Sequence, residues 1–383
     1  MKCRIIFLLV LFTLPVLALR PGDKVGNPEF RLKWIDCTPF KIGELNKEEK
    51  KITPQLRALV FLFTRSDSSA RVMQILERTR QAHRDKLLIG AVTPDTAHDA
   101  ELFRKRYPDF RVRLAVDSER KLTPLFMAGS MLYPMGFIYD NDGKILWNGE
   151  AVDLPEAVEL ILNGKCDVDK QRKISLLLDD MQQLMRTGEH RPLQRKAEQI
   201  FKLDPANQSA LRMLLFICEN SGRTQDAWSV LQARIKAAPG TLRLYFTALD
   251  MMRRYPVYRK DLPQLAEMFV KNAAAPGQLI AFAEALLANF SEDISAIEAA
   301  AKVVAAEKIY SAVTPVEKAQ YHLVCSRLCY LCCDMKNAEK HSRTALEIYR
   351  SCRYTPGITR AEKMLEFYQK IENLNVGKPA AAM

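Results

Sequence analysis

Short apolar runs alternate with helical periods between residues 58 and 162, and this alternation restricts the fold more than any other feature. The run ALVFLF at 58–63 is continuous enough for a strand that is covered on both faces. Residues 70–83 then place apolar side chains at helical spacing. Further predicted elements are strands at 86–92 and 111–116, helices at 97–107, 121–126 and 154–162, and a hairpin at 137–147. This order predicts a mixed sheet with helices on both faces.

The first twenty residues, MKCRIIFLLVLFTLPVLALR, have the pattern of a signal peptide. Lys2 and Arg4 precede an apolar run that is short for a bilayer span, and small residues follow it. No second long apolar segment occurs. We therefore expect a signal peptide at 1–18, an exported protein that is periplasmic or secreted, and no stable membrane span after signal removal.

The formal net charge of +12 raises the question of nucleic-acid binding. The basic clusters are scattered along the chain without interleaved aromatic residues, which is typical of solvated helix faces. Export also argues against such a ligand. We predict no nucleic-acid partner.

Three segments of the first half carry a family resemblance. They are GDKVGNPEFRL at 22–32, FLFTRSDSSARVMQIL at 61–76 and LYPMGFIYDNDGKIL at 132–146. Together they resemble thioredoxin-fold proteins of the TlpA-like or AhpC/TSA redoxin group. The resemblance implies a thioredoxin-like domain over 21–165, with Pro134 at the position of the family's cis proline.

The same resemblance places Ser66 and Ser69 where the family carries its two catalytic cysteines. A serine hydroxyl stays protonated near neutral pH and forms no disulfide, so this turn cannot exchange thiols. A nucleophilic serine would need an adjacent base, and no histidine lies in the turn or beside Pro134. The turn can also be understood as ordinary helix capping by Ser66, Asp67 or Ser68. We predict a redox-inactive domain without a cofactor, and we favour a binding protein over an enzyme.

Two alternatives stay open at this point. In the first, the chain is a thiol-disulfide oxidoreductase or peroxidase that uses a cysteine outside the turn, with Cys37 the leading choice. One thiol alone cannot run a two-thiol exchange, so Cys37 is more readily a turn residue or one half of a bridge. In the second, a small ligand or an extended peptide binds beside Pro134.

The second half is helical and contains a repeat. Gly188 and Gly222 are 34 residues apart, as are Pro205 and Pro239, and this spacing resembles the tetratricopeptide repeat. A third copy covers 323–348. Between 242 and 309 the spacing departs from 34, so we expect helical pairs there and not clean repeats. The predicted order is a linker at 166–173, an all-α tetratricopeptide-like solenoid at 174–375 and a disordered tail at 376–383.

In tetratricopeptide repeats, the first helices line a concave face that binds protein or peptide partners. The resemblance implies that this chain has such a face. Some of the corresponding residues could instead pack on the neighbouring repeat. The partner-binding candidates are Arg212, Phe216, Glu219, Asn220, Leu323, Arg327 and Tyr330.

His322 and the cysteines that follow it are residue types that bind Zn²⁺. Ligands on one rigid helix cannot easily surround an ion tetrahedrally, and buried cysteine behaves as a small apolar residue. We therefore predict no metal in this segment. The residues concerned are His322, Cys325, Cys329, Cys332 and Cys333.

Overall fold

The structure is a computed structural model that describes residues 18–26, 32–35, 37–39, 41–127, 133–306, 309 and 314–376. By its internal contacts the chain divides into unit 1, which ends at Gln199, and unit 2, which begins at Ile200. Within the described ranges, no helix combines the length and the apolar character needed to cross a bilayer. The predicted signal peptide, apart from its last residue, lies outside these ranges, as do residues 377–383 of the predicted tail.

Unit 1 is built on one mixed sheet of six strands in the order β1-β4-β3-β2-β5-β6. Strands β2, β3 and β4 are parallel to one another, while β1, β5 and β6 each run antiparallel to a neighbour. The strands are β1 (Lys33–Ile35), β2 (Leu56–Phe61), β3 (Leu87–Thr93), β4 (Arg113–Val116), β5 (Met135–Asp140) and β6 (Ile145–Glu150). The predicted mixed sheet is confirmed, and β1 is an addition to it.

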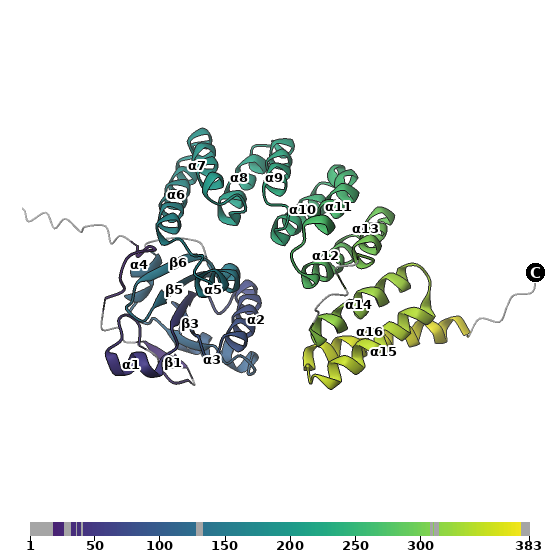
Figure 1. The fold of residues 1–383 in the computed structure, drawn as a ribbon, viewed down its shortest axis with the longest axis horizontal. Coiled ribbons are helices and arrows are strands. Elements are labelled where there is room, and N and C mark those ends of the chain that lie inside the picture. Colours follow the sequence, from purple (N-terminus) through teal and green to yellow (C-terminus); the bar gives the residue numbers. More distant parts are fainter. Residues whose placement is uncertain are drawn as a thin grey trace, which may run out of the picture. The chain divides into compact units, whose positions relative to one another are not determined.

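Side chains of β2 alternate between two apolar cores because successive residues of a strand point to opposite faces. Ala58 and Val60 pack with the helices α2 (Asp67–Ala82), α3 (Ala97–Arg106) and α5 (Leu154–Leu162). Leu59 and Phe61 pack with α4 (Leu122–Met127) on the other face. Figure 1 shows these helices around the sheet, together with the short α1 (Lys47–Ile52). The unit is a thioredoxin-like α/β domain.

A fully buried arginine, Arg57 on β2, ties a loop to this sheet. Its guanidinium donates to the backbone carbonyls of Lys41 at 2.6 Å and Asp140 at 3.0 Å, and also to that of Gly43. The group lies 4.7 Å from the ring centroid of Tyr139. Burial lowers the pKa of Arg57 and raises that of Tyr139. Through these three hydrogen bonds, Arg57 holds the chain before α1 against β2 and the end of β5.

The first long helix, α6 (Val168–Thr187), packs on the outermost strand β6 and so belongs to unit 1. The side-chain amide of Asn148 on β6 donates to the Ser175 hydroxyl at 3.1 Å. Near the helix start, Arg172 forms an ion pair with Asp23 at 2.6 Å. Asp167 caps the helix by accepting from the backbone N–H of Lys170. The residues predicted as a linker, 166–173, thus contain the cap and the first turns of α6.

The chain from α6 onward is all-α. Its helices after α6 are α7 (His190–Leu203), α8 (Gln208–Asn220), α9 (Thr224–Ala237), α10 (Leu242–Arg254), α11 (Leu262–Asn272), α12 (Pro276–Asn289), α13 (Ile294–Val304), α14 (Pro315–Leu331), α15 (Met335–Ser351) and α16 (Thr355–Val376), with a 3₁₀ helix η2 at Pro256–Asp261. They follow one another in hairpin-like pairs (Figure 1).

The starts of three successive first helices, α8, α10 and α12, keep a constant spacing of 34 residues. The starts of their partners α9, α11 and α13 are 38 and 32 residues apart, because η2 lengthens the connection before α11. The expectation that the spacing departs from 34 after residue 242 is therefore correct for the second helices and wrong for the first. Helical pairs continue through this region, and η2 lengthens the connection between α10 and α11.

Left-handed residues follow five of the described helices: Gly164 follows α5, Arg353 follows α15, and three more follow the first helices α6, α8 and α14. Gly188 follows α6 with φ 74°, Gly222 follows α8 with φ 69°, and Cys333 follows α14 with φ 61°. This left-handed region is unfavourable for residues that carry a Cβ, which explains glycine at the first two positions. Cysteine at the third occupies the same turn at a cost in backbone energy.

Candidate functional site

The turn that carries Ser66 connects the end of β2 to the start of α2. Ser66 is the N-cap residue, but its side chain accepts no hydrogen bond from the helix. Its hydroxyl instead lies 2.7 Å from the Ser68 hydroxyl. Ser66 therefore occupies the N-cap position that the capping hypothesis gives it, but its side chain does not make the capping hydrogen bond. No ionisable group that the structure describes is bonded to either hydroxyl, so neither is activated.

Ser69 lies in the first turn of α2 and is 1% exposed. Its backbone N–H donates to the Ser66 carbonyl at 3.0 Å. Its hydroxyl is buried and has no hydrogen-bond partner among the described residues. A buried unpartnered hydroxyl costs free energy, whereas a thiol, which is a weak donor, loses little there. The position suits sulfur better than oxygen.

The loop before β5 lies directly across from this turn. In the sheet Phe61 pairs with Met135, which places Pro134 opposite the first residue after β2. The Tyr133–Pro134 peptide bond is cis. The rings of Tyr133 and Phe63 lie 4.3 Å apart between centroids. Burial raises the pKa of Tyr133. The turn and Pro134 therefore lie at one site. Residues 128–132, which come before Tyr133 in the sequence, are outside the described ranges.

Two carboxylates hold the turn in place. Asp95 accepts from the backbone N–H of Thr64 at 2.6 Å and from its hydroxyl at 2.7 Å. Arg65 forms an ion pair with Asp99 at 2.8 Å. Hydrogen bonds from the Thr96 hydroxyl and from Arg65 lower the pKa of Asp99, which keeps it charged. Both carboxylates accept hydrogen bonds from fixed partners, and within the described ranges neither is bonded to Ser66 or Ser69.

Cys37 lies away from this site. It follows β1, its thiol donates to the Leu114 carbonyl at 3.7 Å, and β1 is separated from β2 by β4 and β3. At about 4.8 Å per strand, the lateral separation from β2 is about 14 Å. The structure does not bring Cys37 together with Ser66 or Ser69.

The eight cysteines that the structure describes are all free. A reactive thiol needs a lowered pKa, because the thiolate is the nucleophile. Burial instead raises the pKa of four of these thiols, in the case of Cys325 to about 11. The four are Cys166, Cys218, Cys325 and Cys329.

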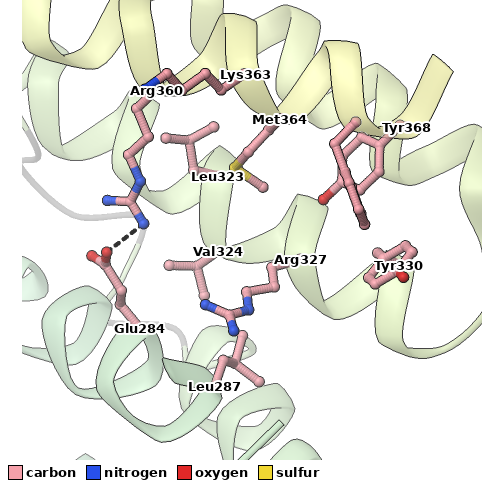
Figure 2. A pocket seen from close by; sticks show the side chains of 11 residues that line it. Glu284, Leu287, Leu323, Val324, Arg327, Tyr330, Arg360, Lys363, Met364 and Tyr368 are labelled. Carbon is pink, nitrogen blue, oxygen red and sulfur yellow. Dashed lines mark ion pairs between the residues drawn. The ribbon is translucent and has the colours of Figure 1, made fainter. Parts of the chain in front are cut away.

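A second candidate site lies in unit 2, where α12, α14 and α16 line a pocket of about 450 Å³. Three predicted partner-binding residues of α14, Leu323, Arg327 and Tyr330, belong to it. Figure 2 shows them facing side chains of α16 across the pocket. The residues that the sequence did not indicate are Glu284, Leu287, Val324, Arg360, Lys363, Met364, Phe367 and Tyr368.

The four candidates on α8 do not line this pocket. Arg212 and Asn220 are exposed, and Phe216 is 54% exposed. Glu219 pairs with Arg254 of α10 across neighbouring first helices. These residues form a solvent-facing surface in which one carboxylate is already paired.

His322 does not turn toward the cysteines of its own helix. Its Nδ1 lies 3.0 Å from Nδ1 of His341 on α15. Burial, His341 and Lys318 together lower the pKa of His322 to about 4, and burial lowers that of His341. Neutral imidazoles can share one N–H in this geometry. Within the described ranges, no group of three or more His, Cys, Asp or Glu side chains is placed to hold a metal ion.

Three solved structures of thioredoxin or thioredoxin-like proteins each match between 32% and 38% of this chain. No protein-family model and no curated protein matches the chain. Among solved structures, a protein described as a thioredoxin from Neisseria meningitidis is 17% identical, with 32% of this chain and 79% of that chain covered, at a TM-score of 0.27. StoA from Bacillus subtilis is 15% identical, with 33% and 96% covered, at 0.26. A thioredoxin-like protein from Porphyromonas gingivalis is 19% identical, with 38% and 91% covered, at 0.27. The fold assignment rests on the sheet order described above, and these values say nothing of activity.

Proposed function

We propose that this chain is an exported thioredoxin-fold protein that has lost its dithiol, and that it binds protein partners through tetratricopeptide-like helical repeats. The observation that carries the first part is the chemistry at the start of α2. Oxygen stands at both positions, and among the residues that the structure describes Ser69 has no hydrogen-bond partner and no base contacts either hydroxyl. A turn of this kind neither exchanges disulfides nor activates a serine.

The second part is supported by the regular helices of the C-terminal region. The constant spacing of 34 residues between the starts of α8, α10 and α12, and the shared left-handed turn at Gly188, Gly222 and Cys333, match a repeat architecture. Stacked repeats present extended surfaces that bind partners.

The first part is tested by reduction of insulin disulfides with the mature protein. We expect no turnover above the dithiothreitol background. The double variant Ser66→Cys/Ser69→Cys serves as the positive control, since the turn keeps its place at the N-terminus of α2, where the helix dipole stabilises a thiolate. Turnover by the unaltered protein that disappears in Cys37→Ser would contradict the proposal and support the oxidoreductase alternative.

The second part is tested by cross-linking the mature protein to partners in its native envelope fraction, followed by mass spectrometry. We expect the cross-linked lysines of this chain to lie between residues 200 and 371. Reproducible cross-links confined to the α/β domain would show that the helical region is not the binding module.

A further inference from the structure

The pocket between α12, α14 and α16 has a cationic end and an aromatic end. Arg360 and Lys363 lie toward one end of the α16 row, and Arg327 extends from α14 toward α12 (Figure 2). At the other end, the rings of Tyr330, Phe367 and Tyr368 contact one another with centroids 5.4 to 5.7 Å apart. A ligand that matches both ends must be negative at one point and apolar at another.

The charges that line the pocket do not cancel. Glu284 is the carboxylate among the lining residues, and it pairs with Arg360 at 2.5 Å. Arg327 and Lys363 form no ion pair in the part of the chain that the structure describes. Two positive charges are therefore left to attract an anionic group, and a carboxylate is a natural partner for a guanidinium.

The floor and the rim of the pocket differ in exposure. Leu287, Leu323 and Val324 form an apolar floor and are at most 3% exposed. On the rim, Phe367 is 47% exposed and Lys363 is also exposed. The rim groups are thus accessible to a ligand, and a large side chain that covers the floor would be removed from water.

The lining residues form two rows that run side by side. On α16 they recur at 360, 363, 364, 367 and 368, a helical stripe about 12 Å long, and on α14 they run from 323 to 330 over about 10 Å. At about 3.3 Å per residue, three or four residues of extended chain match this length. An extended segment suits such a pair of rows better than a compact molecule does.

We propose that this pocket binds an acidic peptide segment in which a large apolar side chain, preferably aromatic, lies within three residues of an Asp or Glu. The inference rests on the proposed function, since it assumes that the helical region binds protein partners. The carboxylate contacts Arg327, Lys363 adds positive potential at the rim, and the apolar side chain packs against Tyr330, Phe367 and Tyr368. The ion pair between Glu284 and Arg360 closes the cationic end and disfavours a ligand that is positive there.

The test is selection of a phage-displayed library of random seven-residue peptides on the full mature chain, with counter-selection on Arg327→Glu/Lys363→Glu. Lys336→Glu/Lys340→Glu, which changes two exposed lysines of α15, is the control with the same change in net charge. We expect the selected sequences to be enriched in Asp or Glu near an aromatic residue. Selected peptides are then synthesised, and their affinity is measured by fluorescence anisotropy.

Changing the acidic residue of a selected peptide to its amide should weaken binding about tenfold, because it removes a charge-assisted hydrogen bond. Arg327→Glu/Lys363→Glu should weaken binding at least as much, while the α15 control should not. Lys363→Glu alone changes one exposed side chain, and it should act in the same direction without affecting the fold, as far-UV circular dichroism can verify.

Peptides that bind the helical region but keep their affinity for Arg327→Glu/Lys363→Glu would overturn the pocket assignment and leave the proposed binding function intact. A selection in which no sequence prefers the wild type over this variant would also overturn it. Failure of the binding function itself is seen separately, in the cross-linking experiment.

Discussion

Lowering the pH from 7.5 to 5 should destabilise the helical region through His322 and His341. The two rings meet between α14 and α15 with their Nδ1 atoms 3.0 Å apart, and the pKa of His322 is lowered to about 4 from an ordinary 6.5. The unfolded chain therefore takes up a proton near pH 6.5, before the folded chain does. The stability that this group contributes is fully present above pH 6.5 and is lost as the pH falls toward 4.

The size of the effect follows from these two values. With a folded pKa of about 4 and an unfolded pKa of 6.5, proton linkage removes about 2 kcal/mol between pH 7.5 and pH 5. The charged groups around the pair act in the same sense, since Lys318 lowers the pKa of His322 and Lys340 lowers that of His341. Asp334 acts in the opposite sense on His341.

Urea unfolding followed by far-UV circular dichroism at several pH values measures this loss, because the helical region supplies most of the signal. The variant His322→Gln should lose about 2 kcal/mol less than the wild type between pH 7.5 and pH 5. His190→Gln, which changes an exposed histidine of α7, should keep the wild-type dependence. Parallel pH profiles for the wild type and His322→Gln would refute the reasoning.

Three further predictions concern stability and are checked by urea or thermal unfolding. Cys333→Gly should stabilise the chain by about 0.5 to 1 kcal/mol, because φ is 61° there; a destabilised variant would show that the thiol contributes more than the turn costs. Asp261→Ala should cost about 1 to 3 kcal/mol, because it leaves the buried indole N–H of Trp228 without its acceptor at 2.8 Å, whereas Asp261→Asn should cost less. Arg57→Ala should cost about 3 kcal/mol or more, because three backbone carbonyls lose their donor, and an unchanged midpoint would contradict the clamp.

Local signals were enough to predict most elements of the α/β domain. Apolar runs and helical spacing gave β2, α2, β3 and α5 to within a few residues, since each element carries its own periodicity. β1 was missed because three residues are too short for any period, and it is defined by its pairing with β4. Strand order and register are non-local and could not be obtained from one sequence without the family resemblance.

Three of the residues that line the pocket of unit 2 are among the partner-binding candidates of the sequence analysis. The repeat pattern indicated Leu323, Arg327 and Tyr330 because it specifies which positions of α14 belong to a first helix. It ended at Ile348, so the α16 row was missed, although charged and aromatic residues at 360, 363, 364, 367 and 368 would have given a helical stripe. The contact of His322 with His341 was missed for another reason. A contact between two helices does not change the hydrophobic period of either helix, so the sequence gives no sign of it.

The position of α6 has a practical consequence for work on the α/β domain alone. A fragment that stops at Lys165, where the thioredoxin pattern ends, would leave β6 without the helix that packs on it. Asn148 would also lose its Ser175 partner. An uncovered outermost strand invites pairing with other chains. Fragments that extend through Thr187 should remain monodisperse, while shorter ones should self-associate on concentration.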